Sequence, residues 1–399
     1  MTESSEADYQ ARVAYEIRKF QNKVRLHELP DIFAYWSNWK IRPKLERFGF
    51  SSPTGMFQKF LGETCQREAY GPKRFISIGS GSCDLEIGLA QHLLSKGYSD
   101  FVIDCLDINP TLLERGRAQA LQNGMETRIS CLQADFNRWE PDHEYDAVIA
   151  CQTLHHVVNL EGLFKNLRDA LKPNGAFIIS DMVGRNGHQR WPEAFHIVQE
   201  FWQELPQSYR FNQQLLRQEE SYVNWDCSTE GFEGIRSQDI LPLLLKTFHF
   251  QLFVAYGNVI DPFIDRAFGH NFNANAEWDR TFIDRVHERD EQEMLAGCIK
   301  PVHIEAVVRK QPCEAMQFHA PFTPEFCLRL PDSADDTTVP MPRSAEDHLK
   351  AATARIWRLE EDNAALHHSV NTLQNRLRVA ADSRWIKLGR KIGLGPKLP

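Results

Sequence analysis

Several features are missing from this 399-residue sequence, and each absence narrows the class of protein. The formal net charge is −8, without the clustered Lys and Arg that a phosphate backbone requires, so we expect no nucleic-acid partner. No apolar run reaches the roughly 18 residues of a membrane span, and the polar, acidic start lacks the apolar segment of a signal peptide. We therefore expect a cytoplasmic protein.

Cysteine is present but lacks the spacing that would give it a structural role. The nine cysteines are scattered and odd in number, and no C-x-x-C pair occurs. This pattern indicates neither a disulfide framework nor a zinc site, and it favours reduced, buried thiols. We expect no metal.

The most informative segment that is present begins at Phe75. Its apolar run to Ile78 predicts a buried strand that breaks into the turn Gly79-Ser80-Gly81, followed by a helix over 85–95. A second predicted strand, 101–107, ends on the carboxylate of Asp107. A glycine turn followed by an acid at the end of the next strand predicts a nucleoside site of Rossmann type.

Strands and helices continue to alternate beyond this pair, which predicts a parallel α/β sheet with helices on both faces. Further strands are expected at 128–133, 145–150, 176–181, 248–256 and 302–308, with a helix over 160–171. The whole chain divides into 1–70, an N-terminal helical lid region; 71–310, the α/β domain with a helical insertion at about 189–247; 311–344, a Pro-rich linker; 345–382, a coiled coil; and 383–399, a basic amphipathic tail.

The segment 345–382 repeats apolar residues in heptads. Leu349, Ile356, Asn363, Val370 and Leu377 share one position, and Ala352, Leu359, Leu366, Leu373 and Ala380 share the other. This pattern favours a parallel two-stranded coiled coil and hence a homodimer, although one long helix folded back on the domain is the alternative. The tail could rest on an anionic surface at the inner membrane face or dock onto a protein partner, and a frayed, solvated end explains it equally well.

As a set, five motifs resemble the class I S-adenosylmethionine-dependent methyltransferases over about 74–181, with weaker similarity to residue 310. They are Ile78-Gly79-Ser80-Gly81-Ser82-Cys83, Leu106-Asp107, Ala134-Asp135-Phe136, Tyr145-Asp146-Ala147-Val148 and Leu171-Lys172-Pro173-Asn174-Gly175. The resemblance implies a Rossmann-like seven-stranded sheet whose last strand is antiparallel. It also implies that S-adenosylmethionine lies across the carboxyl ends of the strands.

The resemblance assigns roles to individual residues in the cofactor site. Gly79, Ser80 and Gly81 would approach the methionine part of the cofactor, and Cys151 would line the space near the sulfonium. Asp107 would bind both ribose hydroxyls. Ile108 would pack on adenine, and Asp135 would accept a hydrogen bond from the adenine amino group with Phe136 beside it. The chain departs from the family at Ser77, where an acid is common, and at Cys83, where a third glycine is common. The cofactor ammonium would then fall to Asp84 or to Glu86, and Asp84 could equally cap the following helix.

Methyl transfer to an alcohol calls for a base, and His155 and His156 follow the fourth predicted strand. A neutral imidazole could take the hydroxyl proton, or one histidine could only shape the loop. The polar and aromatic segments 217–226 and 261–271 are candidates for acceptor binding, although solvated surface explains their charges as well. We expect O-methylation of a small-molecule or glycan hydroxyl. The alternatives are a catalytically idle module that senses the cofactor or assembles through its coiled coil, and a nicotinamide-dependent oxidoreductase.

Overall fold

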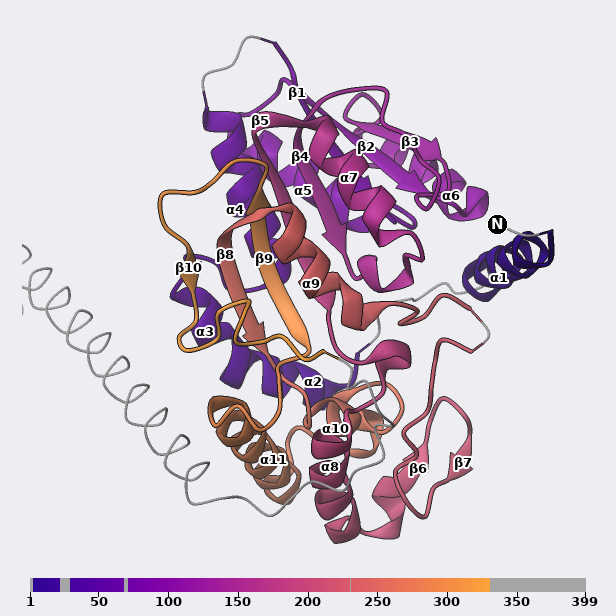
Figure 1. Ribbon diagram of the computed structural model, residues 1–399, viewed down its shortest axis with the longest axis vertical. Helices are drawn as coiled ribbons and strands as arrows, with labels where there is room; N and C mark the ends of the chain where they lie inside the picture. Colours follow the sequence, from indigo (N-terminus) through magenta and orange to yellow (C-terminus); the bar gives the residue numbers. More distant parts are fainter. Residues whose placement is uncertain (1–2, 22–28, 68–70, 230, 331–399) are drawn as a thin grey trace, which may run out of the picture. The chain divides into compact units, whose positions relative to one another are not determined.

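The computed structural model describes residues 3–21, 29–67, 71–229 and 231–330 (Figure 1). The predicted coiled coil at 345–382 and the basic tail at 383–399 lie outside these residues, so the homodimer and the membrane or protein partner of the tail remain predictions. Within the described residues, no helix has the length and the apolar character needed to cross a membrane.

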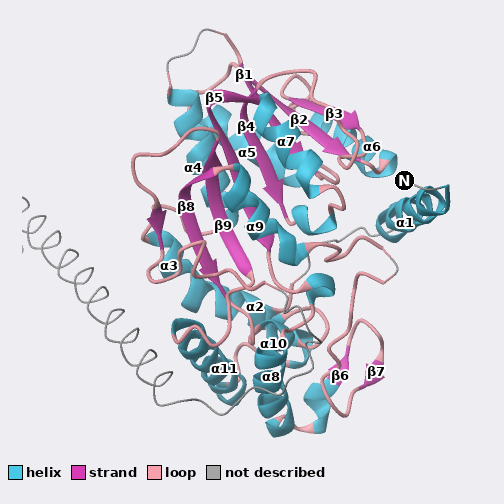
Figure 2. Ribbon diagram, in the orientation of Figure 1, coloured by secondary structure: helices cyan, strands magenta, loops and turns pink. Residues whose placement is uncertain are grey.

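One mixed sheet organises the α/β domain (Figure 2). Its strand order is β10-β8-β9-β5-β4-β1-β2-β3, in which β5 and β8 both pair antiparallel with β9 while the strands from β5 to β3 run parallel. The strands are β1 (Lys73–Ile78), β2 (Phe101–Asp107), β3 (Ile129–Gln133), β4 (Tyr145–Cys151), β5 (Leu171–Met182), β8 (His249–Tyr256), β9 (His303–Arg309) and β10 (Gln317–Phe318). The Rossmann-like sheet and its antiparallel last strand are therefore confirmed, and the short edge strand β10 makes eight strands rather than seven.

Helices cover both faces of this sheet, which explains why its central strands are apolar along their whole length. Helices α4 (Pro53–Gln66), α5 (Asp84–Ser95) and α6 (Pro110–Gln122) lie on one face, and α7 (Leu160–Ala170) and α9 (Ser237–Thr247) pack together on the other (Figure 1). Phe75, Phe101 and Phe177 are fully buried between these layers. The parallel arrangement brings the ends of β1 to β5 to the same edge, where ligands bind in open α/β sheets.

The N-terminal region is helical, as expected. It comprises α1 (Glu3–Gln21), α2 (Asp31–Trp36), a π-helical turn (Ser37–Ile41), α3 (Arg42–Glu46) and α4. Two tryptophans of this region differ in their surroundings: Trp36 is buried and its indole N–H donates to His287 Nδ1 over 3.3 Å, whereas Trp39 is 70% exposed. One therefore belongs to the core and the other to the surface.

The segment between β5 and β8 is only partly helical, which corrects the expectation for 189–247. Helix α8 (Pro192–Glu204) and α9 flank a short hairpin of β6 (Phe211–Asn212) and β7 (Arg217–Gln218), and an irregular loop follows the hairpin. Helix α10 (Asp261–Ile264) and helix α11 (Glu277–Leu295) lie between β8 and β9. Residues 217–226, a candidate segment for acceptor binding, therefore lie in the hairpin and the loop after it and not on a helix.

The expectation that a linker starts at residue 311 is wrong for its first twenty residues. Strand β10 pairs with β8, and behind it His319, Phe322 and Cys327 are buried, with Phe322 fully enclosed. The prolines of this segment suggested an extended linker because proline breaks regular structure. Apolar anchors between them nevertheless bind it to the edge of the domain. Residues 331–344 lie outside the described part of the chain.

Candidate active site

The glycine turn after β1 has the geometry that only glycine allows. Gly79 and Gly81 have positive φ angles of 70° and 54°, a region that is costly for residues with a Cβ atom. A Cβ atom on Gly79 would also lie 2.5 Å from Thr153 Cγ2, which belongs to the loop after β4. The turn therefore brings bare backbone to the sheet edge directly beside the end of β4.

Asp107 ends β2 and holds this turn in place. Its Oδ2 accepts a hydrogen bond of 2.8 Å from the Gly81 N–H, and its Oδ1 accepts one of the same length from the Asn109 N–H. Burial raises the pKa of the carboxyl group, and the two backbone donors oppose that rise. A carboxylate offers about four acceptor sites, so both oxygens keep capacity for ligand hydroxyls.

The loop after β3 supplies a second carboxylate at the same edge. Asp135 accepts from the Asn137 N–H through Oδ1 and from the Tyr9 hydroxyl of α1 through Oδ2. Phe136 follows it and is half-buried, as is Ile108 after Asp107. Ile108 and Phe136 thus lie next in sequence to the carboxylates Asp107 and Asp135. Such an arrangement suits an aromatic ligand ring, which needs apolar contacts on its faces and hydrogen-bond partners at its edges. The role of Tyr9 was missed because no motif links it to a residue 126 positions away.

Asp84 and Glu86 differ sharply in their surroundings. Asp84 is exposed and accepts a 2.6 Å hydrogen bond from the Ser82 hydroxyl, while Cys83 is the N-cap of α5 and makes no capping bond through its side chain. The alternative in which Asp84 caps the helix is therefore wrong. Glu86 is buried: its Oε1 accepts from the Ser77 hydroxyl over 2.5 Å, and its Oε2 has no hydrogen-bond partner among the described residues. Burial raises the pKa of Glu86 to about 7.

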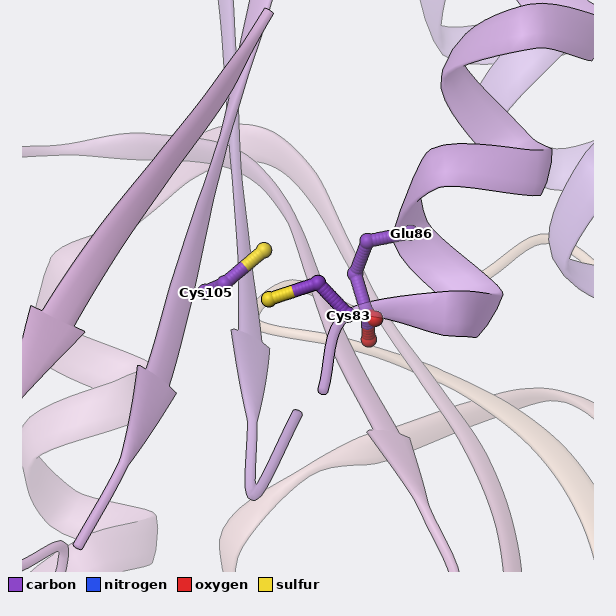
Figure 3. A group of neighbouring side chains, drawn as sticks. All are labelled: Cys83, Glu86 and Cys105. Carbon is purple, nitrogen blue, oxygen red and sulfur yellow. The ribbon is translucent and has the colours of Figure 1, made fainter. Parts of the chain in front are cut away.

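Ser77 and Glu86 together account for one departure from the family pattern. The acid that is common at the position of Ser77 is replaced here by an acid on α5 that reaches Ser77 from the helix. Cys83 accounts for the other departure, since it adopts a positive φ of 61° where a third glycine is common. Its sulfur points toward Cys105, and the Glu86 carboxylate lies beside Cys83 (Figure 3).

The loop after β4 carries the predicted base and its partner. His155 lies in a short 3₁₀ turn (Leu154–His156), and its Nδ1 lies 2.6 Å from Oδ1 of Asp181 in β5. The other oxygen of Asp181 accepts from the backbone N–H groups of Thr153 and Leu154. This carboxylate therefore fixes both the loop and the imidazole. Cys151, the last residue of β4, is half-buried at the same edge.

His155 Nε2 faces a carboxylate that the sequence did not single out. Glu233, in the loop before α9, places Oε1 3.4 Å from this nitrogen and 3.0 Å from His188 Nε2. Burial disfavours a charged imidazole, but Asp181 and Glu233 outweigh it and raise the pKa of His155 to about 10. At neutral pH the imidazole in this arrangement carries a proton, which corrects the expectation of a neutral base.

His156 has the opposite environment. Burial and the adjacent His155 lower its pKa to about 3, and its ring packs edge-on against Phe20 of α1 at a centroid distance of 6.4 Å. An imidazole with so low a pKa is a weak base and accepts a proton poorly near pH 7, so His156 is unsuited to general-base catalysis. Its surroundings are those of a residue that shapes the pocket.

The residues of 261–271 do not form one site. Asp261 is buried between Arg190 and His303, at 3.0 Å and 2.9 Å, and Asn271 donates to the backbone carbonyls of Tyr209 and Phe211. His270 is exposed. The polar groups of this segment therefore stabilise the fold at separate places.

Comparison with known proteins agrees with this geometry. Residues 76–177 match a family described as a methyltransferase domain. A ubiquinone biosynthesis O-methyltransferase of Rickettsia prowazekii (strain Madrid E) is 36% identical over 94 residues, which cover 24% of this chain and 35% of that protein. A sterol 24-C-methyltransferase of Aspergillus fumigatus is 32% identical over 81 residues, covering 20% of this chain and 22% of the relative. The chain thus spans about a third of the length of the ubiquinone-pathway relatives that it matches.

A solved structure of geranyl diphosphate methyltransferase with GPP and sinefungin was also matched. It has 9% sequence identity and a TM-score of 0.36, covering 64% of this chain and 76% of that one.

The sheet order and the glycine turn define a Rossmann-like α/β domain, a class in which ligands bind at the carboxyl edge of the sheet. The matched segment identifies it further: the chain contains a class I S-adenosylmethionine-dependent methyltransferase domain, and S-adenosylmethionine is the cofactor of that class.

Proposed function

We propose that the whole protein transfers the methyl group of S-adenosylmethionine to a hydroxyl oxygen of a small-molecule acceptor. The observation that carries this proposal is the meeting of two arrangements at one sheet edge. One is the glycine turn clamped by Asp107, and the other is the buried line Asp181–His155–Glu233 beside Thr153.

The residues at this edge fit the cofactor. Asp107 would accept the ribose hydroxyls, and Asp135, with Ile108 and Phe136, would receive the adenine. Glu86, whose Oε2 is buried without a partner among the described residues, is better placed than exposed Asp84 to pair with the ammonium group. A buried acceptor that lacks a partner costs free energy, which an arriving ammonium would recover.

Bound S-adenosylmethionine supplies a methyl group on a positively charged sulfur, so that an O–CH₃ bond forms as the S–CH₃ bond breaks, leaving the thioether product and a released proton. The protein's part is to align the acceptor oxygen with that methyl group and to exclude water. Thr153 against Gly79 and Cys151 at the end of β4 would form the wall of this space. His155 remains our candidate for activating the acceptor, while the burial of His156 fits a shaping role.

The acceptor would enter between α1, the loop before α9 and the turn that carries His188. Lys19 of α1 pairs with Glu233 over 3.1 Å, and the Glu16 carboxylate accepts from the Phe232 N–H, so the lid region joins the acceptor side of the site. The curated O-methyltransferase relatives support a hydroxyl acceptor. A glycan hydroxyl remains part of the proposal, with the polar mixture of the loop at 219–226 as its support.

Two further parts of the proposal rest on the sequence alone. The heptads at 345–382 would pair two chains as a parallel coiled coil, and the basic tail would engage an anionic membrane surface or a protein. Both segments lie outside the described residues.

Calorimetric titration with S-adenosylhomocysteine tests the cofactor site, and turnover with a panel of phenols, sugars and lipid alcohols tests the reaction. We expect saturable binding at one site per chain and methyl transfer to at least one hydroxyl class. His155→Gln should lower kcat far more than it weakens cofactor binding. An unaltered kcat would exclude a part for His155 in the reaction, and failure of the wild type to bind would contradict the proposed function itself.

A further inference from the structure

Three side chains from separate loops converge at the acceptor side of the site. His155 follows β4, His188 ends a 3₁₀ turn (Asn186–His188) after β5, and Glu233 precedes α9. One ligand atom from each lies within 4.8 Å of the other two. The side chains are 5%, 16% and 27% exposed, so the cluster is neither sealed in the core nor open on the surface.

Two of the distances among these atoms match the separation of neighbouring ligands around one metal ion, and the third pair, His155 and His188, lies within 4.8 Å. Glu233 Oε1 lies 3.4 Å from His155 Nε2 and 3.0 Å from His188 Nε2. Nitrogen and oxygen ligands lie about 2.0–2.2 Å from a zinc ion, which places neighbouring ligand atoms about 3–3.5 Å apart. Two imidazoles with one carboxylate are also a ligand set that transition metals favour and that leaves coordination positions open.

Asp181 orients His155 as a metal ligand would require. Its Oδ1 also accepts from the Met182 N–H, so the carboxylate is ionised and His155 Nδ1 carries the shared proton. The remaining nitrogen, Nε2, then faces Glu233 Oε1 at 3.4 Å, so Nε2 is the atom that a cation between the two side chains would meet. A carboxylate that fixes the far nitrogen of a histidine is the usual support of a metal-bound imidazole.

Backbone contacts hold the three loops in register. The Ile235 N–H donates to the His155 carbonyl over 3.0 Å, and the Gly187 N–H donates to the Gly234 carbonyl over 2.8 Å. His188 has a positive φ of 54°. A Cβ atom on Gly234 would lie only 2.9 Å from the backbone nitrogen of His188, so the two loops approach closely here. A non-glycine residue held in this strained region is a feature that concentrates at functional sites.

Among the described residues, Cys83, Glu86 and Cys105 form a second group with the proximity of metal ligands (Figure 3). All three are buried, and Oε1 of Glu86 already accepts from the Ser77 hydroxyl. An acceptor could not reach a metal there.

We propose that His155 Nε2, His188 Nε2 and Glu233 Oε1 bind one divalent transition-metal ion, Zn²⁺ in the first instance, and that its open positions take the hydroxyl oxygen of the acceptor. The second oxygen of Glu233 stays on Lys19, so the carboxylate binds through one atom. The identity of the acceptor oxygen rests on the proposed function, whereas the metal site itself does not.

Such an ion would change how His155 acts. A metal-bound hydroxyl loses its proton far more readily than a free one, because the cation stabilises the anion that remains. His155 would then activate the acceptor through the cation and would not remove the proton itself.

The test uses the full chain, stripped with a chelator and titrated with Zn²⁺ in competition with a chromophoric chelator. We expect one site per chain, little competition from Mg²⁺, and at least tenfold weaker Zn²⁺ binding in both His188→Ala and Glu233→Gln. Asp181→Asn should weaken binding about ten- to hundredfold through His155. His196→Ala, which removes a histidine 60% exposed on α8, is the matched control and should bind like the wild type.

Thermal melting and titration with S-adenosylhomocysteine accompany each variant, so that loss of folding or of the cofactor site is recognised separately. If the wild type binds Zn²⁺ no more tightly than Glu233→Gln does, the three side chains share protons only and the proposed metal site is wrong. The methyltransferase proposal stands if S-adenosylhomocysteine still binds in that case, and it fails independently if the wild type does not bind this ligand.

Discussion

The hydroxyl of Tyr9 donates a 2.7 Å hydrogen bond to Asp135 Oδ2, which joins α1 to the loop after β3. The Arg138 guanidinium lies 4.7 Å above the Tyr9 ring, and Glu6 pairs with the same arginine. Helix α1 is thus held at the proposed adenine end of the site largely by side-chain contacts. Contacts of this kind can break and re-form without disturbing the sheet, which suits a lid.

Replacing Tyr9 with Phe should make S-adenosylhomocysteine leave about fivefold faster, because the bond to Asp135 that closes α1 contributes about 1 kcal/mol. Association should change little, since Asp135 keeps its own acceptor sites for the ligand. Stopped-flow binding measures both rates. Tyr98→Phe, on a half-buried tyrosine after α5, is the control. Equal dissociation rates for the two variants would show that α1 does not act as a lid.

Asp107→Ala should weaken binding of S-adenosylhomocysteine at least tenfold, roughly 1.4 kcal/mol. The substitution removes the acceptor proposed for the ribose hydroxyls, and it also releases the Gly81 N–H. Calorimetry gives the affinity directly. Asp142→Ala, whose side chain is 74% exposed in the same domain, should bind normally. An unchanged affinity in Asp107→Ala would contradict the assignment of the ribose site.

Glu86 should make cofactor binding depend on pH. Its pKa is raised to about 7, so the fraction of ionised carboxylate falls about tenfold between pH 8 and pH 6. Since the cofactor ammonium requires the anion, affinity for S-adenosylhomocysteine should fall about tenfold over the same interval. Glu86→Gln should bind weakly at pH 8 with a flat profile, and Asp84→Asn should behave as the wild type. A flat wild-type profile would argue against Glu86 as the ammonium partner.

The same shift predicts a change in stability that needs no ligand. Because the pKa of Glu86 is raised on folding, its contribution to the free energy of unfolding is present below about pH 4.5 and is lost as pH rises through about 7. Glu86→Gln should therefore melt at a higher temperature than the wild type at pH 8, with a smaller difference at pH 5. A lower melting temperature at pH 8 would show that the charge is tolerated in the core.

Asp290 stabilises the turn after β8 and should matter to folding alone. Its buried carboxylate accepts from the backbone N–H groups of Asn258, Val259 and Ile260. Asp290→Ala leaves these donors unpaired, so we expect a loss of about 3 kcal/mol in the free energy of unfolding. Urea denaturation measures it, with exposed Glu288→Ala as the comparison. A loss below about 0.5 kcal/mol would mean that water or another group replaces the carboxylate.

Removing the residues after 344 should yield a monomer by light scattering while leaving the affinity for S-adenosylhomocysteine unchanged. The heptads are the basis of this prediction, since they supply a self-complementary apolar seam. The full chain should scatter as a dimer. A shortened chain that remains dimeric would place the interface elsewhere.

The sequence predicted the parts of the fold that local pattern determines. The strands from β1 to β4 appear within a residue or two of their expected bounds. In β1, β2 and β4 the reason is an apolar run that is buried on both faces. Gly79, Gly81 and Asp107 meet as expected, since a strand-to-turn junction and the end of the next strand are necessarily neighbours in a parallel sheet. The antiparallel β9 was expected only from the resemblance to class I methyltransferases, and no local pattern predicted it.

The residues that the sequence did not reveal are those brought together by long connections. Glu233 lies 78 positions after His155, and Tyr9 lies 126 positions before Asp135, so no spacing rule relates them. The protonated state of His155 was missed for the same reason, since it depends on Asp181 and Glu233 together. The packing of 311–330 on the domain was not predicted, because the few buried residues of this segment, such as Phe322 and Cys327, stand among prolines.

The enclosure of Phe322 also sets where this domain can be cut. A recombinant chain ending at Lys310, just past β9, would discard β10 and uncover Phe253 and its neighbours along β8. An exposed hydrophobic edge strand of this kind promotes intermolecular strand pairing and precipitation. Laboratories seeking a minimal catalytic fragment should keep at least the residues to Leu330, even though every recognised sequence motif ends much earlier.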